Sequence, residues 1–101
     1  MSVADGDCVS VIALPTVASL QAFVRQTLCE RDRLDPGQTP FFRTPVLRGG
    51  KVSGVLYHVH GPRRLRLSAI WSKLEHRILF YDPNGVRWLE VRLSEAPEVG
   101  D

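Results

Sequence analysis

The stretch from Val52 to Leu93 contains short segments in which apolar and polar residues alternate, separated by turn-like breaks. The segments are VSGVLYHVH, RLRLSAIWS, HRILFYD and VRWLEVRL, and the breaks are HGPR, KLE and DPNG. A period of two residues places successive side chains on opposite sides of a β-strand. The pattern therefore predicts an antiparallel meander in this half of the chain.

One more strand is predicted before this stretch, over Phe41–Arg48. Pro45 inside it has no N–H to donate to a ladder, so we expect this strand at an edge of the sheet. Gly49 and Gly50 suit a two-residue hairpin turn, which requires positive φ at both positions. The second strand then runs to His60.

The remaining strands follow from the same alternation and from the turn residues between them. They are expected over Arg64–Ser72, Arg77–Tyr81 and Val86–Leu93. The sequence Asp82-Pro83-Asn84-Gly85 suits a type I turn followed by a glycine bulge. Gly54 is a candidate bend or bulge within the second strand.

A period of 3.6 residues predicts one amphipathic helix upstream of the strands. Thr16 follows Pro15 and can cap the first helical N–H groups. The packed face of the helix is predicted to contain Leu20, Phe23, Val24, Thr27, Leu28 and Arg31. We expect the helix to end near Leu34, because the segment Asp35–Gly37 disfavours its continuation.

Together these elements predict an α+β domain in which one N-terminal amphipathic helix is followed by a five-stranded antiparallel meander and covers one face of it. The alternative is a small Sm-like or SH3-like barrel with an N-terminal helix, because strands that bend at Gly54 and Gly61 could close. The 101 residues are expected to form a single domain, ordered over about residues 9–93 and flexible at 1–7 and 94–101. The apolar run from Cys8 to Leu14 either adds an edge strand or packs along the sheet, and the sequence leaves this open.

Alternation along the strands divides their side chains between two faces of the sheet. One set is almost entirely apolar and forms the predicted core: Val55, Tyr57, Val59, Leu65, Leu67, Ala69, Trp71, Leu89, Val91 and Leu93. The other set contains Leu56, His58, His60, Arg64, Arg66, Ser68, Ile70, Trp88, Glu90 and Arg92. The strand Arg77–Tyr81 is apolar on both sides, so the second face carries an apolar patch. Such a patch usually marks a partner surface, commonly a second copy of the chain, although barrel closure or docking of Val9–Leu14 would also cover it.

The net charge of +2 hides an uneven distribution along the chain. Residues 38–93 carry ten basic and three acidic residues, a net charge of +7, whereas both ends are acidic. A basic surface favours acidic partners such as nucleic acids. The N-terminus lacks the basic region of a secretory signal, and the apolar run Val9–Leu14 is too short to span a membrane. We therefore expect a soluble, cytoplasmic protein with no membrane contact.

His58 and His60 are two residues apart on a predicted strand, so their side chains leave the same face. They could share a metal ion, but the sequence places no third ligand beside them, and we predict no metal site and no cofactor. Next to Arg64 and Arg66 they could also act as an acid and a base on a phosphodiester. The chain has no nucleophile motif and no glycine-rich phosphate loop, so no catalytic residue is assigned.

The strongest functional signal is the mixture of arginines and rings on the second face of the sheet. The candidate residues for binding nucleic acid are Arg64, Arg66, Arg92, Trp88, Tyr81, His58 and His60, with Arg87 beside them. Arginines bind phosphates and flat rings stack on bases, which is how sheets bind single-stranded RNA or DNA. The hypothesis is a non-enzymatic module that docks RNA or single-stranded DNA. The alternatives are a homodimeric interaction or assembly subunit whose arginines only solvate the surface and, more weakly, a small histidine-dependent ribonuclease.

Three strings of the sequence, QTLCERDRL, HGPRRLRLSAIW and ILFYDPNGVRW, together resemble a group of small uncharacterised bacterial proteins of planctomycete type. The shared features are a TLC-type helix, an HGPR turn, an AIW strand and a hairpin that runs from FYD to GxR. The resemblance covers about Ser19 to Leu93. It implies a cytoplasmic bacterial protein that forms one domain, and no site residues carry over from it.

Overall fold

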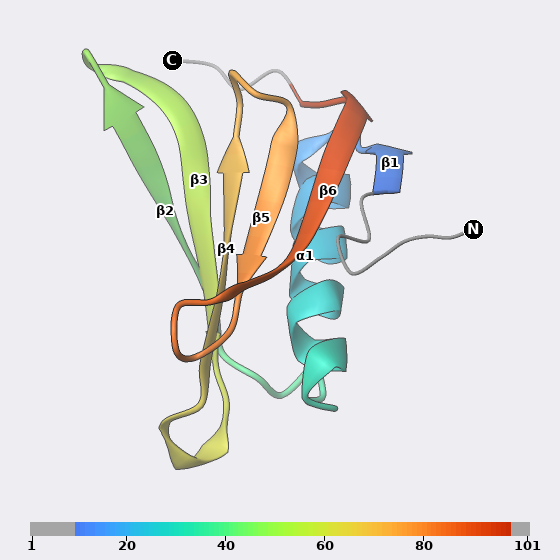
Figure 1. Ribbon diagram of the computed structural model, residues 1–101, viewed down its shortest axis with the longest axis vertical. Helices are drawn as coiled ribbons and strands as arrows, with labels where there is room; N and C mark the ends of the chain where they lie inside the picture. The colour runs from blue at the N-terminus through green and yellow to red at the C-terminus, as the bar shows by residue number, and fades with distance from the viewer. Residues whose placement is uncertain (1–9, 98–101) are drawn as a thin grey trace.

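A computed structural model of the protein describes residues 10–97, which form one α-helix and one six-stranded sheet (Figure 1). In chain order the elements are β1 (Ser10–Ala13), α1 (Val17–Arg31), β2 (Phe41–Arg48), β3 (Lys51–His60), the short 3-10 helix η1 (Pro62–Arg64), β4 (Arg66–Ser72), β5 (Arg77–Tyr81) and β6 (Arg87–Glu95). The order across the sheet is β1-β6-β5-β4-β3-β2. The α+β class and the meander from β2 to β6 are confirmed, and the sheet differs from the prediction by one added strand.

The added strand is β1, which pairs with β6 in parallel and makes the sheet mixed. Ile12 lies opposite Leu93, and the Leu14 N–H donates to the Glu95 carbonyl at 2.9 Å. This pairing continues β6 to Glu95, two residues past the boundary predicted from the sequence. Among the described strands, β1 and β2 form the two edges, so the sheet is open and the barrel alternative is wrong. Cys8, Val9, the predicted flexible segment 1–7 and residues 98–101 of the predicted flexible segment 94–101 lie outside the described residues, whereas Ser94 and Glu95 belong to β6.

Helix α1 begins as the sequence predicts, with Thr16 as its N-cap. The Ser19 N–H donates to Thr16 Oγ1 at 3.0 Å, and the Thr16 N–H donates to Ser19 Oγ at 3.1 Å. This reciprocal pair is a capping box in which serine takes the position that glutamate often occupies. It fixes the direction in which the chain leaves β1 for the helix.

The helix ends at Arg31, three residues before the predicted Leu34. Arg33 adopts a left-handed φ of 57°, the Leu34 N–H donates to the Cys29 carbonyl at 2.7 Å, and the Arg33 N–H donates to the Glu30 carbonyl at 3.2 Å. These bonds form a Schellman motif, which terminates the helix before the proline segment is reached.

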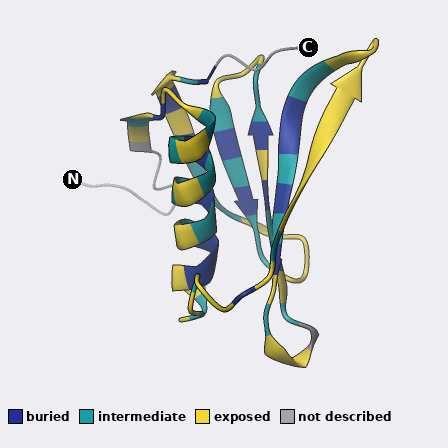
Figure 2. Ribbon diagram, turned by 180° about the vertical axis from the view of Figure 1, so that it is seen from behind, coloured by how far each residue is buried: buried dark blue, intermediate teal, exposed yellow. Residues whose placement is uncertain are grey.

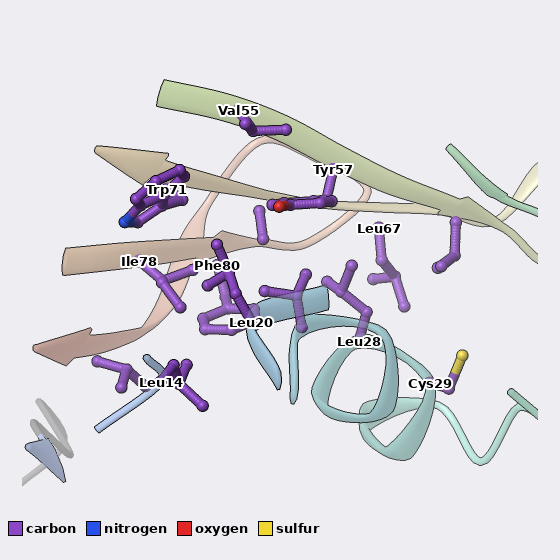
Figure 3. Close-up of a cluster of buried hydrophobic side chains, with 14 of the residues drawn as sticks. Leu14, Leu20, Leu28, Cys29, Val55, Tyr57, Leu67, Trp71, Ile78 and Phe80 are labelled. Atoms are coloured by element: carbon purple, nitrogen blue, oxygen red, sulfur yellow. The ribbon is translucent and has the colours of Figure 1, made fainter. Parts of the chain in front are cut away.

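Helix α1 covers one face of the sheet, here called the inner face, and the opposite face is called the outer face (Figures 1 and 2). Buried residues of the inner face and of the helix form one apolar cluster: Leu14, Leu20, Val24, Leu28, Cys29, Val55, Tyr57, Val59, Leu67, Ala69, Trp71, Ile78, Phe80, Val91 and Leu93. Figure 3 shows strand side chains such as Tyr57 and Phe80 directed toward Leu20 of the helix. Eight of the ten predicted core residues are buried, and Leu65 and Leu89 are half-buried.

The β2–β3 hairpin turns as predicted, with φ of 62° at Gly49 and 82° at Gly50. The register of this hairpin shifts between Val46 and Leu47, where β3 contains one extra residue. Gly54 lies at this bulge, and a Cβ atom there would lie 2.1 Å from the Trp71 carbonyl oxygen. The bulge predicted at Gly54 is therefore present and sterically requires glycine.

The β5–β6 turn also matches its prediction. The Gly85 N–H donates to the Asp82 carbonyl at 2.9 Å, and Gly85 has a φ of 81°. The Asp82 carboxylate accepts bonds from the Asn84 and Val86 N–H groups, each at 2.9 Å. This turn fixes the first pair of the β5–β6 ladder, in which Tyr81 at the end of β5 lies opposite Arg87 at the start of β6.

Candidate nucleic-acid interface

The register of the strands aligns five side chains in one row across the outer face. Successive cross-strand partners give the row Phe42, His58, Ser68, Tyr81 and Arg87, from β2 to β6. Each member lies on a different strand, and adjacent strands are about 4.8 Å apart. The row therefore spans about 19 Å and presents rings, a hydroxyl and a guanidinium on the same face.

At the β2–β3 end of this row, Phe42 and His58 form a stack of three rings with His60, which lies in the next row of the same face. The ring centroids of Phe42 and His58 are 5.1 Å apart with an interplanar angle of 21°, and those of His58 and His60 are 5.0 Å apart at 28°. Phe42 is 44% exposed, so a flat surface remains open to solvent. His58 and His60 are brought together as predicted, and Phe42 is a member that the sequence analysis missed.

The environment of His58 disfavours its charged form. Partial burial lowers the pKa of the His58 imidazole from its ordinary value of 6.5, and the neighbouring charges of Arg66 and His60 lower this pKa further. His58 is therefore predominantly neutral at pH 7, and its ring presents a face for stacking rather than a fixed positive charge.

Arg66 and Arg87 supply exposed positive charge at the two sides of this region. Arg66 lies opposite His60, and Arg87 lies opposite Tyr81. Among the residues that the structure describes, no carboxylate forms an ion pair with either arginine. Both guanidinium groups are therefore available to an anionic ligand.

Beside the ring stack, the chain forms an open hollow of about 420 Å³ at the β3–β4 connection, here called the turn hollow. Its lining residues are His60, Gly61, Leu65 and Arg66. A Cβ atom at Gly61 would lie 3.1 Å from Leu34 Cδ1 and 3.2 Å from Leu65 Cδ2, so glycine permits close packing at this connection. The hollow combines one apolar wall with an imidazole and a guanidinium.

The next row of the outer face is apolar at its centre. Leu56, Ile70 and Leu79 are cross-strand partners, and Ile70 is 36% exposed. No described element covers these side chains, so the predicted apolar patch on this face is present. Figure 2 shows that exposure extends over most of β2, and every residue of this strand after Phe41 is exposed.

Arg92 lies on the outer face but two rows away from Arg87, beside Arg77. The Arg92 Nε atom is 3.5 Å from Glu90 Oε2, and Arg77 contacts both Glu75 at 2.6 Å and Glu90 at 3.2 Å. The Arg92 side chain is nevertheless 64% exposed. The structure thus separates Arg92 from the ring stack, and the two glutamates partly neutralise this end of the face.

Trp88 was predicted on the outer face, and this is wrong. The register of β5 and β6 shifts after Phe80, leaving Trp88 as an extra residue between the pairs Tyr81–Arg87 and Phe80–Leu89. A bulge of this kind places two successive side chains on the same side of a strand. Trp88 accordingly contacts the ring of Phe80, at a centroid distance of 5.6 Å, and lies beneath the guanidinium of Arg31, 5.2 Å away.

Arg64 was predicted at the start of a strand, alternating with Arg66, and it instead belongs to η1. Pro62 begins this short helix and Arg63 has a φ of 59°, so the chain reaches β4 only at Arg66. The side chain of Arg64 lies outside the described residues. A pairing of Arg64 and Arg66 across one strand is therefore not part of the interface.

Other chemistry is sparse in the described part of the chain. Between residues 10 and 97, no three side chains of the metal-ligating kinds come together. Cys29 is fully buried in the core, and burial raises the pKa of its thiol, which makes it an apolar core residue rather than a nucleophile. Neither of the described helices, α1 and η1, has the length and apolar content that crossing a bilayer requires.

Comparison of the chain with known protein families, with curated proteins and with solved structures finds no match.

Proposed function

We propose that the protein is a binding module for single-stranded RNA or DNA, and that the ligand lies on the outer face of the sheet. The observation that carries this proposal is the row from Phe42 to Arg87, in which the exposed ring of Phe42 and the half-buried rings of His58 and Tyr81 lead to Arg87, a guanidinium that no described carboxylate neutralises. Arg66 continues this positive charge beside the ring stack.

The spacing of the rings supports single strands over duplexes. Tyr81 lies two strands away from His58, which is about 10 Å at the usual strand spacing. Ser68 lies between them and can donate or accept a hydrogen bond. Unpaired bases can stack on such separated rings, whereas the bases of a duplex are stacked on one another and are not accessible to them.

The test is fluorescence anisotropy of the protein with labelled single-stranded RNA, single-stranded DNA and duplex DNA across a salt series. Each neutralised phosphate contributes about 0.7 to the log-log salt slope for single strands. Replacing both free arginines, in Arg66→Gln/Arg87→Gln, should therefore lower the slope by about 1.4. Single strands should bind more tightly than the duplex.

The matched control is Arg33→Gln/Arg43→Gln, which removes the same charge from exposed positions away from the outer face. Arg33 follows the helix, and Arg43 shares the inner side of the sheet with Tyr57. An equal fall in salt slope for both double variants would assign the binding to net charge alone and reject the proposed face. Absence of binding at low salt would reject the function.

A second function is favoured by the apolar row Leu56, Ile70 and Leu79, which suits self-association through the outer face. Light scattering over a range of protein concentrations tests it. A dimer that Ile70→Lys converts to a monomer is expected if this row is an interface between copies. A wild-type monomer at every concentration would exclude this second function.

A further inference from the structure

A second basic hollow lies at the opposite end of the sheet from the turn hollow. It has a volume of about 240 Å³ and is here called the hairpin hollow. Its lining residues are Arg48, Lys51, Val52, Ser53, Lys73 and Leu74. They come from the β2–β3 hairpin and from the β4–β5 turn, which lie at the same end of the sheet in Figure 1.

The charge of the hairpin hollow favours an anion. Of the six lining residues that the structure describes, three are cationic and none is acidic. Glu75, the carboxylate nearest in sequence, is held by Arg77 at 2.6 Å. Val52 and the 69% exposed Leu74 add an apolar wall, which suits the ribose or base attached to a phosphate.

The two hollows are joined by strand β3. From Val52 to His60 the strand advances eight residues, or roughly 26 Å at about 3.3 Å per residue. The outer face between these ends carries the apolar row through Leu56 and the ring stack at His58. At a stacked rise of about 3.4 Å per nucleotide, about eight nucleotides cover this distance. A nucleic acid in a more extended conformation covers it with fewer nucleotides.

We infer that the hairpin hollow binds a phosphate of the same nucleic-acid strand that the outer face binds, so that one strand runs along β3 from the turn hollow to the hairpin hollow. This inference rests on the proposed function and adds to it a direction, a second anchor and a minimum ligand length. It predicts that Arg48 and Lys51 increase the affinity only of those oligonucleotides that are long enough to reach both hollows.

The experiment compares strands of about three and about ten nucleotides, measured by anisotropy across a salt series. For Arg48→Gln/Lys51→Gln the salt slope of the long strand should fall by about 1.4, and binding of the short strand should be unchanged. The charge-matched control Arg33→Gln/Arg43→Gln should leave the slopes of both strands unchanged. Both pairs of substitutions are at exposed positions, so the folded state should be retained.

Two outcomes would overturn the inference while leaving the proposed function in place. The first is that Arg48→Gln/Lys51→Gln binds the long strand like the wild type although Arg66→Gln/Arg87→Gln does not. The second is that an acidic peptide, rather than the strand, loses affinity in the hairpin variant, which would make the hollow a protein-docking site. Failure of the wild type to bind either strand would instead reject the proposed function together with this inference.

Discussion

The two faces of strand β5 differ in burial although their residues are similarly apolar. Ile78 and Phe80 point to the inner face and are fully buried, whereas Leu79 and Tyr81 point to the outer face and are half-buried. The difference comes from α1, which covers only one side of the sheet (Figure 2). The burial of a β5 side chain therefore depends on whether α1 packs against its face of the sheet, and not on how apolar the residue is.

Residues of the inner face stabilise the fold, whereas residues of the outer face are available to a ligand. The inner face is continuous with the helix and forms the apolar cluster. The outer face has an apolar centre, a ring stack at one end and arginines at its margins. Substitutions on the inner face should therefore change the free energy of unfolding, and substitutions on the outer face should change binding.

The largest expected effect is on folding, from truncating Phe80. Its ring contacts Phe23 and Trp88, with centroids 6.3 Å and 5.6 Å away. Phe80→Ala should lower the free energy of unfolding by about 3 to 5 kcal/mol, measured by urea denaturation. Leu79→Ala, one residue away on the outer face, should cost markedly less. Equal losses would contradict the assignment of the two faces.

A smaller effect is expected from truncating either of the adjacent residues Phe41 and Phe42, which should change different properties of the protein. Phe42→Ala should weaken binding of single strands by about 1 to 3 kcal/mol, because a stacked base loses its platform. Phe41→Ala should instead lower stability by about 2 kcal/mol, because Phe41 stacks on Tyr57 at 5.6 Å and lies under Arg25. Anisotropy and urea denaturation of both variants test this contrast, which would fail if Phe42→Ala bound normally.

A still smaller effect concerns pH and the outer-face histidine. The folded-state pKa of His58 lies below its ordinary value of 6.5, so the His58 imidazole binds fewer protons in the folded protein than in the unfolded chain. This stability contribution is present above pH 6.5 and is lost as the pH falls toward the folded-state pKa. Urea denaturation between about pH 8 and about pH 5 should show this loss, and His58→Gln should reduce it. An identical pH profile for the variant would remove His58 as the cause.

The smallest expected effect is on tryptophan fluorescence. Trp71 is 1% exposed, and Trp88 lies on the inner face under Arg31. A strand bound to the outer face cannot stack on either indole, so adding a saturating oligonucleotide should leave the tryptophan emission nearly unchanged. Strong quenching, absent in Trp88→Phe, would place the ligand on the helix side.

Much of the fold could be predicted from capping residues, turn residues and the alternation of apolar and polar positions. The two misplaced site residues, Trp88 and Arg64, lie at a bulge and in a turn, where alternation does not hold. The Thr16 cap, the two glycine-containing hairpin turns and the core face follow from residue chemistry and a period of two. Trp88 was misplaced because strict alternation from Leu89 takes no account of a bulge. Arg64 was misplaced because Pro62 starts a short helix in a turn whose type the sequence does not specify.

Phe42 was missed because the two phenylalanines at the start of β2 lie on opposite faces. The two-residue turn alone pairs Arg48 with Lys51 and, continued without interruption, would place Phe41 opposite His58. The extra residue at the Gly54 bulge shifts the register by one and places Phe42 there instead. Combining the turn with the bulge signal at Gly54 would have identified it. The parallel pairing of β1 depends on the position of the helix, which four residues cannot specify.

The most direct test of the outer-face account is an NMR titration of the isotope-labelled protein with a single strand of about ten nucleotides at low salt. If the ligand lies on the outer face, the amide shifts should extend to the β2–β3 hairpin, α1 should change little, and the largest shifts should be those of Phe42, His58, His60, Arg66 and Tyr81. Shifts confined to α1, or no shifts at a saturating ratio, would contradict it.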